Sequence, residues 1–444
     1  MTSQKRTIAA YVVLGVSAVM YAALGYAMPR DNFAQLVLLF AVCFAGYVYV
    51  VNQRVPLWHG IAAAIFFRLI LLPATPLLSD DYFRFIWDGR LLSAGINPYL
   101  YLPGYFVQEG ATIVSGINEA LFQRLNSPNY YSVYPPVAQA VFWLSAKLSP
   151  YSITGSIVVI RVIILVAEVL NIFLLLRLLR KMGLSDGHVL LYALNPLVIL
   201  ELTGNLHFEA LMIFFVLLGL YQLFYQRVVW AGCAFGLAVG VKLLPLLFLP
   251  FMWRKLGTRQ FFYFLTAVGL TLIVVSFPLI NLEVIQHIAT SVNLYFQRFE
   301  FNASVYYLLR WVGLQLTGYN QIAIIGPLLS LATFAIVVPM AAVKKLGSVR
   351  RLAGYMAAAL TVFLLLATTV HPWYITTLVA LTTLSAFRFA VVWSGLAILS
   401  YSAYRTSIYS EDTALIMLEY TIVMLWLLVE VYLYRQRRSH ANLK

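Results

Sequence analysis

The chain has 444 residues, of which 62% are hydrophobic and only 10% are charged. A typical soluble domain has about 25% charged residues, so this composition excludes a soluble enzyme, a secreted scaffold and a fibrous protein. On a soluble protein the net charge of +14 would suggest nucleic acid, but here the basic residues lie mainly between apolar segments. That distribution is typical of the positive-inside pattern of membrane proteins. We therefore expect a polytopic membrane protein that binds no nucleic acid.

Apolar segments long enough, or nearly so, to cross about 30 Å of hydrocarbon recur along the chain. Lys5 and Arg6 precede the first segment without a clear cleavage site, which predicts a retained anchor. Cys43 and Cys233 lie in separate apolar segments and support neither a disulfide nor a metal site. We predict an all-α protein with about twelve crossings, at 7–27, 33–51, 58–74, 152–179, 188–203, 209–225, 261–280, 321–342, 352–369, 373–386, 390–403 and 413–432.

The apolar segment 229–252 is the exception to this pattern. As a single crossing it would move Arg254, Lys255 and Arg259 to the far side and invert every later loop. We therefore predict a re-entrant hairpin of two half-helices that turn at residues 240–242 and return. Both termini are then cytoplasmic.

This topology divides the chain into three parts. We expect N-terminal transmembrane helices at 1–74, an extracytoplasmic catalytic loop with interfacial helices at 75–151, and a transmembrane bundle at 152–444. Nearly all the unusual polar residues then converge on the extracytoplasmic face.

The large loop opens with two adjacent carboxylates, Asp80 and Asp81. Ser79 or Asp80 can cap a helix with an apolar stripe that ends near Gly95. Local chemistry leaves two interpretations open. The carboxylates either serve catalysis, or they cap the helix and pair with Arg84.

An aromatic turn lies later in the same loop, at residues 129–134, and leads into Pro135-Pro136. Proline is favoured at the first position of a helix, so we predict that another helix starts here. Tyr131 and Tyr134 are expected to contact substrate, although tyrosines are also common anchors at a membrane interface.

Five segments of the chain resemble GT-C glycosyltransferases in residue type and order. They are most similar to the polyprenyl-phosphate-mannose-dependent mannosyltransferases of glycosyltransferase family 87 and to GPI mannosyltransferase I. The resemblance covers roughly residues 70–390, and the family carries an acidic residue or Asp-x-Asp where this chain has an adjacent pair. The segments are Asp81 with Gly95 and Pro98-Tyr99, Gly204-Asn205-Leu206-His207-Phe208-Glu209, Lys242-Leu243-Leu244-Pro245, Phe301-Asn302-Ala303-Ser304 and His371-Pro372-Trp373-Tyr374.

The resemblance implies the GT-C fold and an inverting glycosyltransferase. Such an enzyme transfers a sugar, here mannose, from a polyprenyl-phosphate carrier to a lipid or glycan acceptor on the extracytoplasmic face of the bacterial cytoplasmic membrane. Asp81 matches the family's register and is the expected base, while Asp80 would position the acceptor or hold Asp81.

Further site residues follow from the same resemblance. Lys242, His371 and Arg298 are expected to bind the donor phosphate. We expect no cofactor, because the chain has no nucleotide fingerprint and its extracytoplasmic histidines lack metal-ligand spacing. The residues expected to contact substrate are Arg84, Tyr131, Tyr134, His207, Glu209, Trp373 and Tyr374.

Structural interpretations stay open beside these functional ones. Lys242 could extend its ammonium toward the cytoplasm, and His371 could simply bond at a helix end. His207 and Glu209 could form a solvated pair. Arg68, Arg161 and Glu168 lie within spans, where we expect structural ion pairing, for instance of Arg161 with Glu168.

Three rival functions are also open. A polysaccharide polymerase or ligase would use a lipid-linked oligosaccharide as its donor. A transporter would use segment 229–252 with Arg68, Arg161 and Lys242 as a pathway, and would predict internal repeats that we do not find. A structural subunit would leave the clustered polar residues without a purpose.

Overall fold

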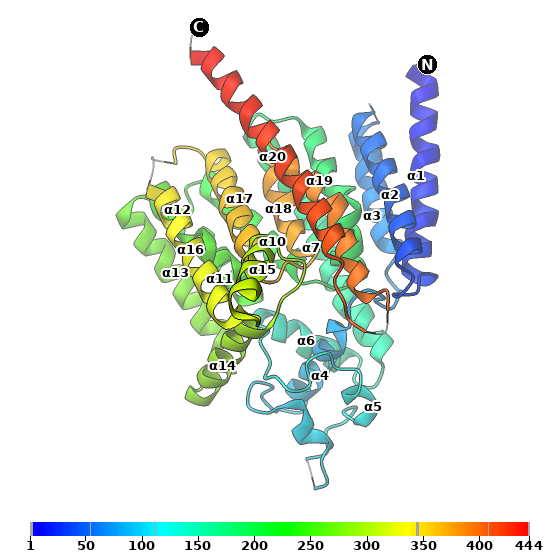
Figure 1. Cartoon of the computed structure of the whole chain (residues 1–444), viewed down its shortest axis with the longest axis vertical. Helices are drawn as coiled ribbons and strands as arrows, with labels where there is room; N and C mark the ends of the chain where they lie inside the picture. Colours follow the sequence, from blue (N-terminus) through cyan, green and yellow to red (C-terminus); the bar gives the residue numbers. More distant parts are fainter. Residues whose placement is uncertain (1–2, 54, 111, 343–345, 407, 443–444) are drawn as a thin grey trace.

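The structure is a computed structural model that describes residues 3–53, 55–110, 112–342, 346–406 and 408–442, without the side chains of 3–6, 292–298, 438 and 440–442. Its regular elements are all helices, and the one β-bridge among the described residues joins Phe301 to Thr369. Figure 1 shows both chain ends at one end of a helical bundle. The opposite end, called here the loop end, carries α4 (Asp81–Ser93), α5 (Glu119–Phe122), α6 (Pro136–Leu148) and α14 (Leu282–Arg298).

Seven helices of the described chain are long and apolar enough to cross a membrane. They confirm the prediction of an all-helical, multi-pass membrane protein. These helices are α1 (Ser3–Tyr26), α2 (Phe33–Asn52), α7 (Ile153–Lys181), α13 (Thr258–Ser276), α16 (Ile322–Ala342), α17 (Val349–Leu366) and α20 (Thr413–Asn442).

The other predicted crossings fall on shorter or bent helices, so the count of twelve stays a prediction. One of them is a pair bent by 50°, Asp186–Ala193 with Pro196–Gly204, which ends in a π-helical turn. Its pieces are η2 (Asp186–Val189), α8 (Leu190–Ala193), α9 (Pro196–Val198) and η3 (Ile199–Gly204). The short apolar helices are α3 (Leu57–Ile70), α10 (Glu209–Phe224), α11 (Val228–Val241), α18 (Tyr374–Thr383) and α19 with η5 (Phe389–Leu396 and Ala397–Tyr404).

Local signals explain where these helices begin and end. At the start of α7 the Ser152 hydroxyl accepts the Gly155 amide at 3.0 Å, and the helix ends before Gly183, whose φ is +65°. Its last turn carries Arg180 and Lys181, which suit the negative end of the helix dipole. α6 starts at Pro136, as the sequence predicts.

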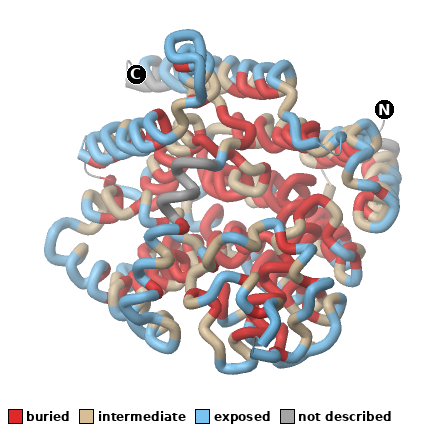
Figure 2. Tube along the Cα trace, turned by 60° about the horizontal axis from the view of Figure 1, so that its bottom comes forward, coloured by how far each residue is buried: buried red, intermediate tan, exposed pale blue. Residues whose placement is uncertain are grey.

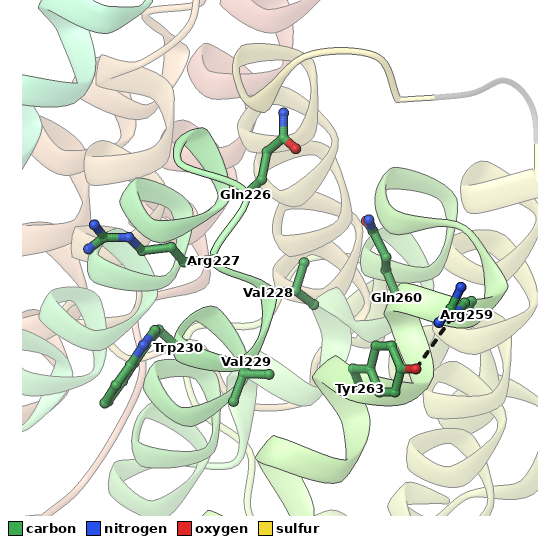
Figure 3. A pocket seen from close by; sticks show the side chains of 8 residues that line it. All are labelled: Gln226, Arg227, Val228, Val229, Trp230, Arg259, Gln260 and Tyr263. Atoms are coloured by element: carbon green, nitrogen blue, oxygen red, sulfur yellow. Dashed lines mark hydrogen bonds between the residues drawn. The ribbon is translucent and has the colours of Figure 1, made fainter.

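The chain doubles back after α11. α11 ends at Val241, and η4 (Leu244–Phe248) and α12 (Leu249–Leu256) return to Gly257, where α13 begins. The starts of α11 and α13 line one cavity of about 500 Å³ at the end of the bundle that carries the termini (Figure 3). The turn lies at Lys242, the position expected from the charge pattern. A re-entrant location of this segment in a membrane stays a prediction.

The helices of the loop end pack on one another and on the bundle, and their buried apolar residues belong to the same hydrophobic core. Every residue of α4 from Tyr82 to Leu91 is buried, so this helix has no solvated face. α4 crosses α6 so closely that a Cβ on Gly89 would lie 2.2 Å from the carbonyl oxygen of Phe142. Figure 2, with this end turned forward, shows buried segments beneath an exposed outer loop. The remaining helix here is η1 (Pro103–Val107), whereas α15 (Val305–Thr317) packs on α16 and α17 of the bundle.

Candidate functional site

The adjacent carboxylates at the start of α4 have different partners. Asp80 forms an ion pair with Arg30, from the turn between α1 and α2. Asp81 accepts a hydrogen bond from the Asn126 side-chain amide at 2.6 Å and takes part in none of the ion pairs that the described residues form. Both carboxylates are half-buried. Asp80 is the N-cap residue of α4 but its side chain makes no capping hydrogen bond, and the Ser79 hydroxyl accepts the Asp81 amide at 3.3 Å.

Arg30 is a site residue that sequence reasoning missed. Its guanidinium lies 4.3 Å from the ring centroid of Tyr404, at the end of η5. Burial opposes its positive charge, but the neighbouring Asp80 carboxylate outweighs burial and raises the pKa of the Arg30 guanidinium. Arg30 stands in a short turn without any motif, so the sequence carries no local signal for it.

Arg84 pairs with neither of those carboxylates, which corrects the helix-capping interpretation. Its Nε lies 2.8 Å from Asp88, one turn along α4, and both side chains are buried. Asp88 also accepts hydrogen bonds from Ser132 and Gln139. Arg84 further donates to the carbonyl of Tyr130 at 2.9 Å. It therefore holds the aromatic turn against α4, and a role in substrate binding stays a prediction.

The two tyrosines of the aromatic turn face different neighbours. Tyr131 stacks on His287 of α14, with ring centroids 3.8 Å apart. Burial raises the pKa of Tyr134 well above its usual value, and the negative charges of Asp81 and Glu209 raise it further. Tyr134 therefore lies within electrostatic reach of both carboxylates, although they come from different helices.

Lys242, at the turn after α11, forms an ion pair with Glu209 at the start of α10. Its ammonium also lies 4.7 Å from the ring centroid of Tyr374. One third of the Lys242 side chain is exposed, whereas Glu209 is buried and its Oε2 has no hydrogen-bond partner in the described chain. The ion pair thus combines a partly exposed Lys242 ammonium with a buried Glu209 oxygen that can still accept a hydrogen bond.

The segment 204–209, which carries Glu209, has an unusual backbone conformation. Leu206 has a φ of +64°, a left-handed conformation rare for a branched side chain. Asn205 holds the segment by donating to Glu201 at 3.2 Å and accepting the Leu78 amide at 3.3 Å. Leu78 lies just before Asp80, so this contact ties the α10 entry to the start of the loop.

Four aromatic rings form a column beside Lys242. His207 stacks on Trp373 at 3.7 Å, Trp373 on His371 at 4.3 Å, and His371 on Phe301 at 4.7 Å between ring centroids. Burial lowers the pKa of His371 to about 3, and the neighbouring His207 and Lys242 contribute to the shift. The imidazole is thus neutral near pH 7 and can offer one N–H to a ligand.

Backbone pairing joins the last two motif segments. The Phe301 amide donates to Thr368 at 3.1 Å, and the Val370 amide donates to Phe301 at 2.8 Å. This bridge places the Phe301 ring against His371.

Asn302, next to that bridge, has a φ of +45° and is held by residues far along the chain. Its amide donates to Glu411 at 2.5 Å, its side chain donates to Glu419 at 3.3 Å, and its carbonyl accepts from Tyr420 at 2.7 Å. Glu411 and Glu419 were not among the predicted site residues. They shape the segment that carries Phe301.

Arg298 precedes the same segment, and its side chain lies outside the described residues. Its predicted phosphate contact therefore stays a prediction. Its neighbour Glu300 pairs with Arg310 at 2.6 Å and accepts from the Tyr306 hydroxyl at 2.5 Å.

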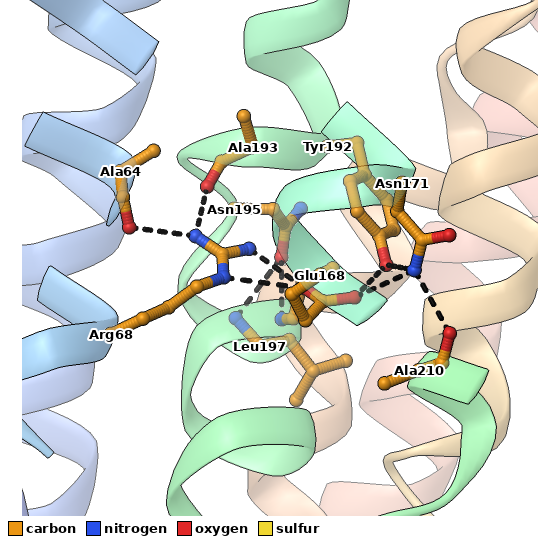
Figure 4. Close-up of polar contacts among 10 residues, drawn as sticks. Ala64, Arg68, Glu168, Asn171, Tyr192, Ala193, Asn195, Leu197 and Ala210 are labelled. Atoms are coloured by element: carbon orange, nitrogen blue, oxygen red, sulfur yellow. Dashed lines mark hydrogen bonds and ion pairs between the residues drawn. The ribbon is translucent and has the colours of Figure 1, made fainter. Parts of the chain in front are cut away.

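The charges inside the bundle form a separate network, and one expected partner was wrong. Glu168 of α7 pairs with Arg68 of α3 at 2.9 Å, not with Arg161 (Figure 4). Arg161 instead donates to backbone carbonyls, including those of Thr203 at 2.8 Å and Gly204 at 2.9 Å. It thereby supports the bend that leads into the 204–209 segment.

Fold and site together define a multi-pass helical membrane protein whose acidic, basic and aromatic groups gather at one end. A family model described as "Alpha-(1->6)-mannopyranosyltransferase, N-terminal domain" matches residues 33–258, half of the chain. The chain belongs to this family, the MptA_B family. The membership confirms the resemblance to GT-C mannosyltransferases, which are a class of glycosyltransferases.

Two curated relatives carry the same enzyme name. Alpha-(1->6)-mannopyranosyltransferase A of Corynebacterium glutamicum is 24% identical over 200 residues, which cover 44% of this chain and 38% of the relative. An alpha-(1->6)-mannopyranosyltransferase of Mycobacterium tuberculosis is 28% identical over 158 residues, which cover 34% of this chain and 25% of the relative. The matched part of the chain thus spans well under half the length of either relative.

Proposed function

We propose that this protein is an inverting mannosyltransferase that uses a polyprenyl-phosphate-linked mannose. It passes the mannose to a lipid or glycan acceptor at the loop end, on the extracytoplasmic face. Family membership supports mannosyl transfer. The polyprenyl-phosphate donor and the face follow from the GT-C resemblance and from the charge pattern.

One observation carries the mechanism: Asp80 is neutralised by Arg30, whereas Asp81 has only a neutral amide partner among the described residues. An ion-paired carboxylate is a poor proton acceptor because its negative charge is already stabilised. Asp81 is therefore the base. It removes the proton of the acceptor hydroxyl while that oxygen attacks C1 of the mannose. The bond between C1 and the phosphate oxygen breaks on the opposite face, and polyprenyl phosphate leaves.

Lys242 and His371 are suited to the departing phosphate. The Lys242 ammonium is partly exposed at a turn, where it supplies a point charge. The neutral His371 supplies an N–H, and the second negative charge that develops on the leaving phosphate would raise its pKa toward the normal range. Trp373, stacked between His207 and His371, holds the His371 ring in place beside the same position.

Transfer by purified protein tests the proposal, with radiolabelled polyprenyl-phosphate-mannose as donor and membrane lipids as acceptors. We expect Asp81→Asn to lower kcat about 100- to 10,000-fold, which is the usual contribution of a general base. Asp80→Asn is the matched control, and it should retain most of the activity. Equal turnover by Asp81→Asn would reject Asp81 as base. Transfer from a nucleotide-linked mannose, or only from a lipid-linked oligosaccharide, would reject the proposed donor.

The proposed face is tested by chemical labelling of intact cells. Ile113 in the loop is 96% exposed, and Tyr225 lies between α10 and α11 at the opposite end. In a chain without Cys43 and Cys233, a membrane-impermeant maleimide should label Ile113→Cys but not Tyr225→Cys. The reverse pattern would reject the proposed orientation.

A further inference from the structure

A small cavity at the loop end is not used by the mechanism above. It has a volume of about 210 Å³ and lies between the end of α4, α5 and the start of α7. Sites that enclose a drug-sized molecule usually measure about 300–1,000 Å³, so this cavity admits a single group of a larger ligand. Its polar lining consists of Arg90, Arg124, Asn118, Tyr151 and the backbone of Gly116.

Arg90 is buried in the wall of this cavity without a counter-ion. Its Nη1 donates to the Gly116 carbonyl at 2.6 Å, and its buried Nε has no hydrogen-bond partner in the described chain. It forms no ion pair with any described carboxylate, whereas Arg84 on the same helix has Asp88. A buried cation without a counter-charge is costly, so an anion bound here would be stabilised.

The backbone of Gly116 is shaped around this guanidinium. Its φ of +82° is a conformation that glycine adopts without strain. A Cβ at this position would lie 2.9 Å from Arg90 Nε. The turn therefore fixes the guanidinium in the cavity wall.

Arg124 brings a second cation to the same cavity. Its side chain is exposed and lies 5.5 Å from the ring centroid of Phe83. It takes part in none of the ion pairs of the described residues. The nearest acid in sequence, Glu119, accepts instead from the side-chain amide of Gln123. The cavity thus has two positive groups, and no carboxylate among the described residues forms an ion pair with them.

Two residues of the cavity lining lie close to Asp81 or its partner along the chain. α4 runs from Asp81 to Arg90, a rise of roughly 13 Å at 1.5 Å per residue. Arg124 stands two residues before Asn126, whose amide donates to Asp81. The nine-residue step from Asp81 to Arg90 makes about two and a half helical turns, so these two side chains project to opposite sides of α4. A ligand that contacts both must therefore be long enough to extend around the helix.

We propose that this cavity binds an oxyanion, a phosphate or carboxylate, carried by the acceptor. The inference rests on the proposed function, in which the acceptor hydroxyl meets Asp81. The donor's phosphate cannot occupy the cavity during transfer, because it is bonded to the carbon that the acceptor attacks beside Asp81. A group roughly 13 Å away therefore belongs to the acceptor. The enzyme would thus select acceptors that carry a negative charge at that distance from the reacting hydroxyl.

Kinetics with two acceptors tests this proposal. The pair consists of a neutral alkyl mannoside and the same mannoside with a phosphate on its alkyl end. We expect Arg124→Met to raise KM for the charged acceptor about tenfold, the effect of losing one charge-assisted hydrogen bond. KM for the neutral acceptor, KM for the donor and kcat should stay unchanged. Lys147→Met, at an exposed lysine of α6, is the control for loss of a charge and should change none of them.

A binding measurement separates this proposal from the proposed function. Inorganic phosphate should raise the Tm of the purified wild-type protein and of Lys147→Met. The rise in Tm should be smaller for Arg124→Met and Arg90→Lys. If transfer is absent but this difference is present, the anion site stands and the proposed function fails. An equal rise in all four proteins, no rise in any, or an equal KM change for both acceptors would overturn the anion site.

Discussion

Two groups of charged side chains lie within this helical chain, and they differ in how completely they are paired. In the bundle, all three guanidinium nitrogens of Arg68 donate, to Glu168 and to the carbonyls of Ala64 and Ala193 (Figure 4). The second oxygen of Glu168 accepts from Tyr192 at 2.5 Å. Of this network only Asn171 Oδ1 has no hydrogen-bond partner among the described residues.

The group at the loop end is incompletely paired. Glu209 Oε2 is buried without a hydrogen-bond partner in the described chain, and Asp81 has only an amide. His207 Nε2 lies 3.4 Å from Glu201 Oε2 but makes no hydrogen bond among the described residues. A buried polar atom without a partner costs free energy, so a fold retains one where a ligand completes it. The difference teaches that charge within a membrane protein does not by itself indicate function. Open hydrogen-bonding capacity at an accessible place is the better indicator.

Removing Arg68 from the paired network of the bundle should give the largest effect. This effect should concern stability alone. Arg68→Met leaves the Glu168 carboxylate buried and unpaired, which typically costs about 3–5 kcal/mol of unfolding free energy. Denaturant unfolding in detergent measures this loss. Arg68→Met combined with Glu168→Gln should recover much of it, because no uncompensated charge remains. A loss of turnover per folded molecule would contradict the structural role.

Removing a cation from the loop end should act on catalysis instead. Lys242→Met should lower kcat/KM about 100- to 1,000-fold, or 2.7–4 kcal/mol, as for other preorganised electrostatic groups. It also leaves Glu209 without its partner. Adding Glu209→Gln should therefore restore stability but not the rate. Recovery of the rate in the double variant would mean that Lys242 only neutralises Glu209.

How far the sequence predicts this molecule depends on the range of each interaction. Apolar runs predict the helices, and the charges after residue 252 predict the turn at Lys242, because both signals are local. Glu168 and Arg161 lie seven residues apart, on one face of a helix. This closeness in sequence favoured the wrong prediction that they form an ion pair. Arg68 is 100 residues away, and only packing of α3 on α7 brings it near. The contacts of Asn302 with Glu411 and Glu419 escaped prediction for the same reason.

The neutral His371 predicts a pH dependence of stability. Its pKa is about 3 in the folded protein, against about 6.5 in an unfolded chain. Below pH 6.5 the unfolded state therefore binds a proton that the folded state does not, so stability falls as pH decreases. Between pH 6.5 and 5 the loss is up to about 2 kcal/mol. His371→Phe keeps a stacking ring without a titrating group, and its unfolding free energy should depend less on pH. An identical pH dependence in both proteins would contradict a neutral histidine in the folded protein.

The smallest expected effect concerns Arg30, which distinguishes the two adjacent carboxylates. Arg30→Met leaves the Asp80 charge uncompensated next to Asp81. Two adjacent negative charges repel each other, so the uncompensated Asp80 disfavours a negative charge at its neighbour. The acid limb of kcat/KM should then move upward by about one pH unit, equivalent to about 1.4 kcal/mol. The rate above that limb should change little.

A second substitution separates charge from packing in this prediction. Arg30→Met with Asp80→Asn has neither the cation nor the second carboxylate, so the acid limb should return to its wild-type position. The other groups near Asp81, Asn126 and the phenols of Tyr134 and Tyr404, are neutral at these pH values and are the same in both variants. A shift that persists in the double variant would mean that Arg30 acts through its stacking on Tyr404. The unequal roles of Asp80 and Asp81 would then need another cause than their charges.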